Sequence, residues 1–107
     1  MRIAQVSPLY ESVPPQHYGG TERVVAYLTE ELVRAGHDVT LFASGDSHTS
    51  ARLVPMTERS LRLDPDCVDA LAHHVLMLER ISRVATDFDI LHYHVDYLHF
   101  PFSRRAG

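Results

Sequence analysis

Residues 19–43 read GGTERVVAYLTEELVRAGHDVTLFA, which is a helix pattern followed directly by a strand pattern. Two glycines open the stretch, Thr21 is the predicted N-cap, and Glu22 in the first turn complements the partial positive charge of a helix N-terminus. Apolar residues then recur at spacings of three and four, which predicts a single buried stripe along the helix. That stripe consists of Val24, Val25, Leu28, Leu32 and Ala35.

Strand patterns stand on both sides of this helix. Gly36 is the expected left-handed residue that ends the helix. Residues 38–43, DVTLFA, form an apolar run typical of a buried strand, and residues 3–7 predict another short strand. Two strands joined through a helix indicate a parallel pair with a right-handed crossover.

The remainder continues the alternation of strands and helices. Pro55 makes residues 52–56 an edge strand, residues 64–66 (Asp-Pro-Asp) predict a helix start, residues 87–94 a third major strand and residues 96–105 a short helix. The sequence therefore predicts an α/β fold, a Rossmann-like parallel sheet flanked by helices, with one apolar sheet edge uncovered. The second helix is expected to bury Val68, Leu71, Val75, Leu78, Ser82 and Ala85.

Composition limits the classes of function. The 107 residues make one domain at most, and ten basic against fourteen acidic residues give a net charge of −4. All ten basic residues are Arg and none cluster, so nucleic acid is not an expected partner. The single cysteine, Cys67, cannot form an intramolecular disulfide, which fits a reducing compartment. No apolar run approaches the ~20 residues of a membrane span, and no signal peptide is recognisable, so we expect a cytoplasmic location and no transmembrane segment.

The glycine pair Gly19-Gly20 stands between the first strand and the first helix. In open α/β sheets, ligands bind beyond the carboxyl ends of the strands. A helix N-terminus offers free amide N–H groups and a partial positive charge to a phosphate, and glycine lets the backbone approach it closely. A tight turn without any ligand explains the two glycines equally well.

A histidine cluster follows the last strand. The spacing His92-x-His94-x-Asp96-x-x-His99 resembles the metal motif of metallo-β-lactamase-like hydrolases. However, Tyr97 stands where that motif has its last histidine, and the chain before it alternates strands with helices. Histidines at the mouth of a cleft or in a half-polar core are the favoured interpretation. We therefore predict no metal, with a zinc hydrolase as the alternative.

Two other polar clusters have structural explanations. His73 and His74 are adjacent in the second helix and are expected to face solvent or to be half-buried. Asp64, Asp66 and Asp69 stand at the expected helix start, where capping accounts for them without a metal.

Four segments together resemble a known family. They are MRIAQVSPLYE at residues 1–11, YGGTERVV at residues 18–25, LVRAGHDVTLFA at residues 32–43 and DFDILHYH at residues 87–94. In this order they look like the N-terminus of family-four glycosyltransferases, and the resemblance covers essentially the whole chain. It implies a GT-B fold, in which two Rossmann-like domains face each other across a cleft.

The resemblance also implies an activity. These enzymes transfer a sugar from a nucleotide-sugar donor to an acceptor with retention of configuration, and they generally need no metal or other cofactor. Residues 1–107 would be a partial N-terminal, acceptor-side domain, with the donor-binding C-terminal domain absent. The family's catalytic histidine and its paired-glutamate motif have no counterpart here, so we expect a fragment that is inactive alone.

Site residues follow by matching positions. The resemblance implies that Gly19 and Gly20 reach towards the donor phosphates and that Glu22 orients this loop. His17, Tyr18 and His94 are candidates for the acceptor pocket, with packing an equally good explanation of the loop residues. No catalytic residue is assigned.

A second hypothesis belongs to another functional class. The chain would be a non-catalytic nucleotide- or protein-binding module, and another chain would supply the missing domain and complete the sheet. The donor base, the transferred sugar, the acceptor and the oligomeric state are not determined by the sequence.

Overall fold

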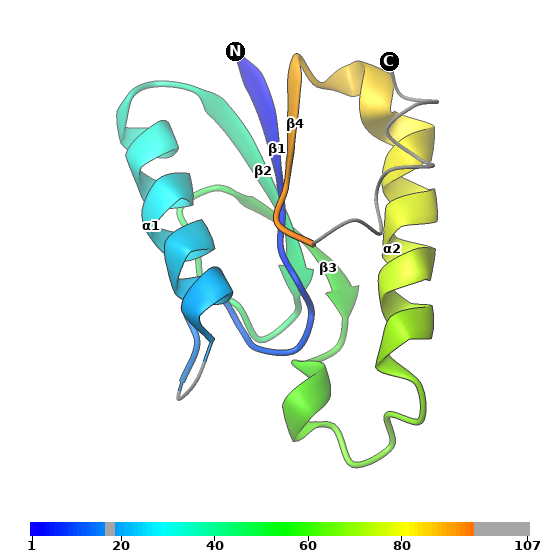
Figure 1. Cartoon of the computed structure of the whole chain (residues 1–107). Helices are drawn as coiled ribbons and strands as arrows, with labels where there is room; N and C mark the ends of the chain where they lie inside the picture. The colour runs from blue at the N-terminus through cyan, green and yellow to red at the C-terminus, as the bar shows by residue number, and fades with distance from the viewer. Residues whose placement is uncertain (17–18, 96–107) are drawn as a thin grey trace.

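The computed structural model describes residues 1–16 and 19–95, and the predicted short helix over residues 96–105 lies outside them. Within the described part, a four-stranded parallel sheet has the order β3-β2-β1-β4. Helix α1 covers one face of the sheet and helix α2 covers the other (Figure 1). The predicted α/β, Rossmann-like fold is confirmed. The elements are β1 (Arg2–Val6), α1 (Gly20–Arg34), β2 (Asp38–Ser44), β3 (Arg52–Thr57), η1 (Leu61–Leu63), α2 (Ala70–Val84), η2 (Ala85–Asp87) and β4 (Ile90–Tyr93).

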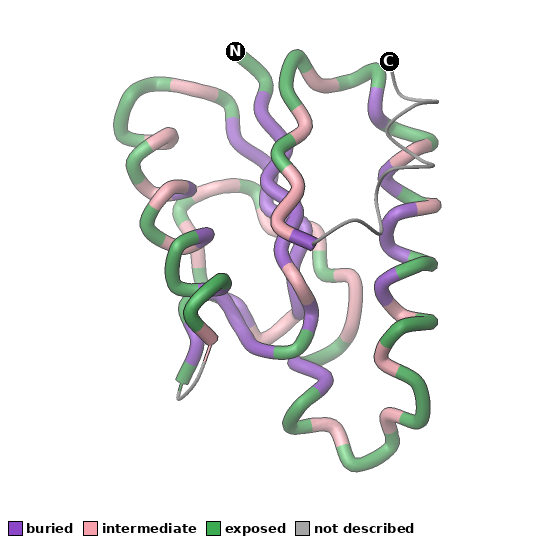
Figure 2. Tube along the Cα trace, viewed as in Figure 1, coloured by how far each residue is buried: buried purple, intermediate pink, exposed green. Residues whose placement is uncertain are grey.

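Strand β2 shows why a central strand of this sheet can be apolar on both faces. Its side chains alternate between two cores, with Leu41 and Ala43 packing on the α1 side and Phe42 on the α2 side. Both faces of the strand are therefore buried (Figure 2). This is the reason for a continuous apolar run in place of polar and apolar alternation.

The register of the sheet places the loop before α1. Val6, at the end of β1, is paired with Phe42 of β2 and with Tyr93 of β4. The carboxyl ends of these three parallel strands therefore lie at the same edge of the sheet. The loop from β1 to α1 starts from the middle of that edge, where open α/β sheets bind their ligands. Strand β3, which carries Pro55, is at the edge of the sheet as predicted.

Helix α1 departs from the prediction at its start. It begins at Gly20 with Gly19 as the N-cap residue, so the prediction of Thr21 as N-cap was wrong. The positive φ of 125° at Gly19 already turns the chain into the helix. At the other end, Gly36 has a φ of 94°, which confirms the predicted left-handed stop.

The buried face of α1 is narrower than predicted. Val25 is buried, but Val24 is 59% exposed and Ala35 is also exposed, while Leu28 and Leu32 are half-buried. The other buried residues of the helix are polar, Glu22 and Thr29. A polar residue can take a core position because it finds a partner there: Thr29 Oγ1 accepts a hydrogen bond of 3.3 Å from the Gln5 side-chain amide in β1.

Helix α2 begins later than predicted. Residues 64–66 form a turn after η1, and the helix begins at Ala70. Asp69 is its N-cap, and its side chain accepts hydrogen bonds from the backbone N–H groups of Leu71 and Ala72. Asp64 likewise accepts a bond from the N–H of Asp66, so a local cap and a turn bond account for the side chains of Asp69 and Asp64.

The face that α2 buries was predicted incorrectly. Val68 is 98% exposed, Leu71 52% and Val75 42%, although these three residues were expected in the core. Ser82 is half-buried, while Leu78 and, in η2, Ala85 are buried as expected. Apolar residues occupy most of the circumference of this helix, so periodicity alone could not select one face. The buried residues of α2 are His74, Met77, Leu78 and Ile81.

Candidate functional site

The loop between β1 and α1 is held by hydrogen bonds from three other segments. The Leu9 N–H donates to His74 Nε2 in α2 at 2.9 Å. The Leu9 carbonyl accepts from the Leu61 N–H of η1 at 2.8 Å. The Val13 N–H donates to Ser47 Oγ, after β2, at 2.9 Å. These bonds give the loop a defined path at the carboxyl edge of the sheet.

The two glycines before α1 differ in what surrounds them. Gly19 has a φ of 125°, and a Cβ there would lie 2.9 Å from Glu22 Oε1 and 3.1 Å from Pro15 Cβ. The turn and its packing therefore require glycine at position 19. At Gly20, an added Cβ would meet no atom within 4 Å in the described part of the chain. Packing therefore does not require glycine at position 20. The space beside Gly20 leaves the first turn of α1 open to a ligand.

Three charged side chains lie beneath Gly19. Glu22 and Glu11 are each only 4% exposed, and Arg62 of η1 forms an ion pair with Glu11. Burial raises the pKa of the Glu22 carboxyl, while hydrogen bonding from the backbone of Glu22 and Glu11 lowers it. The Glu11 carboxylate raises the same pKa and Arg62 lowers it. Two carboxyl groups therefore share one guanidinium, and when both are ionised the cluster carries one excess negative charge.

His94, just after β4, forms a hydrogen bond with Gln5, a buried residue of β1. Its Nε2 lies 3.3 Å from the side-chain carbonyl oxygen of Gln5, which can only accept, so Nε2 donates. The His92 and His94 rings have centroids 4.1 Å apart. Burial, and secondarily the neighbouring His92, lowers the pKa of His94 to about 4. His94 is therefore neutral near pH 7.

His74 is a site residue that the sequence analysis missed. It is 2% exposed, so the prediction of a solvent-facing or half-buried side chain was wrong. Its Nε2 accepts from the Leu9 N–H, and its Nδ1 donates to the Ala70 carbonyl at 2.7 Å. This pair of bonds fixes the neutral tautomer, and burial lowers the pKa of the ring. The Tyr10 ring lies against it, with centroids 4.7 Å apart. Nothing local in the sequence indicates a bond to a loop 65 positions away.

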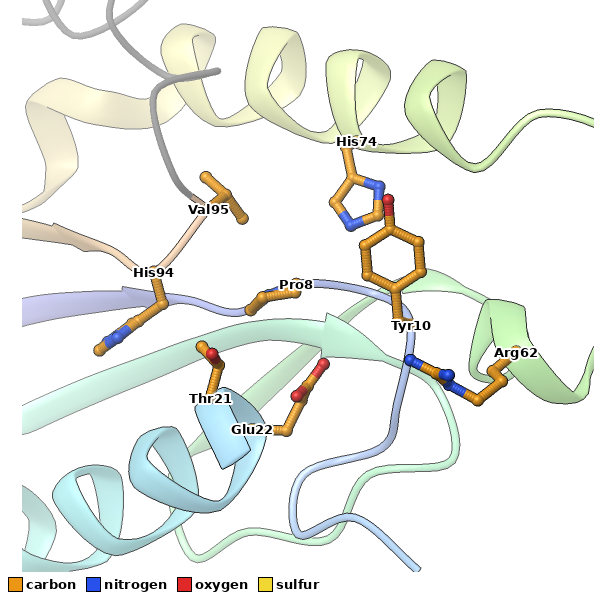
Figure 3. Close-up of a pocket in the computed structure, with 8 residues that line it drawn as sticks. All are labelled: Pro8, Tyr10, Thr21, Glu22, Arg62, His74, His94 and Val95. Carbon is orange, nitrogen blue, oxygen red and sulfur yellow. The ribbon is translucent and has the colours of Figure 1, made fainter. Parts of the chain in front are cut away.

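These elements enclose a pocket of about 240 Å³ at the carboxyl edge of the sheet (Figure 3). The pocket brings together Glu22 and His94, which the sequence analysis selected, and adds Tyr10 and His74. The other two acceptor-pocket candidates, His17 and Tyr18, lie outside the described residues. The lining residues are Pro8, Tyr10, Thr21, Glu22, Arg62, His74, His94 and Val95.

The histidine motif does not assemble a metal site in the described residues. Within residues 1–16 and 19–95, no group of three or more His, Cys, Asp or Glu side chains is placed to hold a metal ion. Asp96 and His99, the other members of the motif, lie outside the described residues. The helices of the described part also include none that is long and apolar enough to cross a membrane.

Comparison with known proteins assigns the family. The model of Glycosyltransferase Family 4 matches residues 18–107. Among solved structures, the chain is similar to AviGT4, a glycosyltransferase involved in avilamycin A biosynthesis, with a TM-score of 0.62 and 33% sequence identity. The match covers 91% of this chain and 27% of AviGT4, so the chain spans about a quarter of that protein's length. No curated protein matches. Since the family model covers most of the sequence, the chain belongs to glycosyltransferase family 4.

Proposed function

We propose that this chain is the N-terminal, acceptor-side part of a retaining glycosyltransferase with a GT-B fold, which transfers a sugar from a nucleotide-diphosphate donor. The observation that carries the proposal is the open N-terminus of α1 at Gly20, next to a pocket at the carboxyl edge of the sheet. Family membership supports glycosyl transfer. The geometry supports two separate positions, one for the donor phosphate at the N-terminus of α1 and one for the acceptor in the pocket. A cytoplasmic location is part of the proposal.

The proposed chemistry uses the charge of the helix end. In a transfer with retention, the diphosphate leaves from the face on which the acceptor hydroxyl arrives. Negative charge develops on the departing phosphate, and backbone N–H groups of the first turn of α1 would stabilise it. The pocket would hold the acceptor beside that position. We assign no described residue as the catalytic proton acceptor. The sugar and the nucleobase of the donor would be bound by a further domain.

The test uses inorganic pyrophosphate, which presents the anion without a nucleoside. The protein is labelled with ¹⁵N, and the amide resonances are followed during the titration. We expect saturable shifts at Gly20 and Thr21. Gly20→Asp places a carboxylate at the helix end and should abolish the shifts, while the uncharged, isosteric Gly20→Asn should retain part of them.

A Cβ at Gly20 meets no described atom within 4 Å, so we expect both variants to fold, and circular dichroism of each variant checks this. Equal binding by the Asp and Asn variants would show that the helix end does not hold the anion. Absence of saturable shifts in the unsubstituted protein would also refute this role of the glycine pair.

One observation favours the second hypothesis, a module completed by another chain. Among the described strands, β4 pairs only with β1, and Ile90 on it is 42% exposed. An edge of this kind can accept a strand from a partner. Light scattering over a concentration series tests this hypothesis. Concentration-dependent association favours the module, and a monomer at all concentrations refutes it.

A further inference from the structure

We propose that the pocket at the carboxyl edge of the sheet takes a polyhydroxylated acceptor unit that carries no negative charge, and that Glu22 sets this preference. The inference rests on the proposed function only in calling the occupant an acceptor. Its basis is the balance of charge in the pocket wall and the shape of the wall.

The charge balance comes from five side chains. Arg62 is the one permanently cationic side chain among the described lining residues, and it is already paired with Glu11 behind the wall. His74 has both ring nitrogens engaged in the neutral form, and His94 is neutral near pH 7. The Glu22 carboxylate therefore faces the pocket as the second of two carboxylates that share the one Arg62 guanidinium.

The end of α1 does not reverse this balance. A helix N-terminus carries the equivalent of roughly half a positive charge, against the full negative charge of a carboxylate. Glu22 lies in the first turn of that helix, with Oε1 2.9 Å from the position of a Gly19 Cβ. A phosphate or carboxylate entering the pocket would meet a net negative wall, whereas a hydroxyl would donate a charge-assisted hydrogen bond to Glu22.

Shape and polarity point to a single sugar ring. The volume of about 240 Å³ is below the roughly 300 Å³ at which pockets for drug-sized ligands begin. The Tyr10 ring, 41% exposed and backed by His74, offers a flat apolar surface to one face of such a ring. The Thr21 hydroxyl and the Glu22 carboxylate come from the opposite wall (Figure 3). A polyol has hydroxyl groups for both.

The experiment compares one neutral and two acidic probes that are built on the same kind of sugar ring. Methyl glucoside, glucose 6-phosphate and methyl glucuronoside are titrated into the ¹⁵N-labelled protein at pH 7, and the amides of Tyr10 and Glu22 are followed. We expect methyl glucoside to bind about tenfold more tightly than either acid, the order of change that one like charge at close range produces in a partly screened site. Glu22→Gln should remove this discrimination.

The matched control is Glu31→Gln on the exposed part of the same helix, which should keep the tenfold ratio. Acids that bind as tightly as the neutral glycoside in the unsubstituted protein would overturn the proposal. So would a ratio that Glu22→Gln leaves unchanged while circular dichroism shows the fold intact. Failure of all three probes to shift the pocket amides would show that the pocket is not a polyol site.

The outcome is separable from that of the pyrophosphate test. Gly20 does not line the pocket, and its amide reports the anion at the helix end, while Tyr10 reports the pocket. Loss of the Gly20 response with retained glucoside binding would reject the phosphate role alone. The reverse pattern would reject the acceptor class alone.

Discussion

The backbone N–H of Leu9 and Nε2 of His74 are joined by a buried hydrogen bond of 2.9 Å across 65 positions of the chain. The bond connects the loop that carries Pro8 and Tyr10 of the pocket wall to α2, the helix on one face of the sheet. Because Nδ1 of the same ring donates to the Ala70 carbonyl, the imidazole can satisfy the loop only in one neutral tautomer.

Replacing this ring should be costly. His74→Ala leaves the Leu9 N–H buried without a partner and opens a cavity beside Tyr10, so we expect a loss of about 3 kcal/mol in the free energy of unfolding. Urea denaturation measures it. His73→Ala, at the half-buried neighbouring position, should cost under about 1 kcal/mol. Similar losses for the two variants would contradict the structural role of His74.

Stability should fall as the solution is acidified through the histidine range. The pKa of His94 is about 4 in the folded protein, against 6.5 for an unperturbed histidine. Below pH 6.5 the unfolded chain takes up this proton and the folded chain does not, so the stabilisation is complete above pH 6.5 and is lost progressively towards pH 4. We expect a loss of about 2 kcal/mol from this residue after allowance for solvent screening.

Chemical denaturation at several pH values between 7.5 and 4.5 would measure this slope. His94→Gln should flatten it, and the lowered pKa of His74 should account for part of what remains. His48→Gln, at an exposed position, should leave the slope unchanged. A His94→Gln variant with the full slope would refute the assignment.

The two glycines at the start of α1 should differ in how strongly replacement by alanine changes stability. Gly19→Ala forces a side chain into a φ of 125° and against Glu22 and Pro15, so we expect a loss of about 2 kcal/mol and altered pocket amides. Gly20→Ala meets open space and should change stability by less than about 0.5 kcal/mol. Thermal unfolding of both variants provides the comparison, and equal effects would show that Gly19 is not constrained by the turn.

The face that α2 buries can be tested by truncation. Ile81 is fully buried and Val75 is 42% exposed, although both belong to the apolar part of the helix. Ile81→Ala should cost about 3 kcal/mol, and Val75→Ala under about 1 kcal/mol. Urea denaturation of the two variants measures the difference. The opposite order would mean that α2 is rotated in solution, with its Val75 stripe in the core.

Short-range patterns in the sequence predicted the topology of the sheet. Gly36 marked the end of α1 because its left-handed φ is costly for other residues, and Pro55 marked β3 as an edge strand because proline cannot donate to a ladder. The mostly apolar run at residues 38–43 indicated a buried strand, and the structure covers this strand on both faces, between α1 and α2. The glycine pair predicted a candidate ligand site beyond the carboxyl ends of the strands, and the loop that carries it starts at that edge of the sheet.

The sequence by itself determined the α/β fold, its parallel strands and the position of the loop before α1, because these follow from spacing, turn residues and caps that act over a few positions. Only the tertiary structure decided which face of α2 is buried, that His74 accepts a hydrogen bond from Leu9, and that Arg62 pairs with Glu11 beside the buried Glu22. Those relations join residues about 50 or more positions apart, and packing of α2 and η1 against the sheet edge selects them.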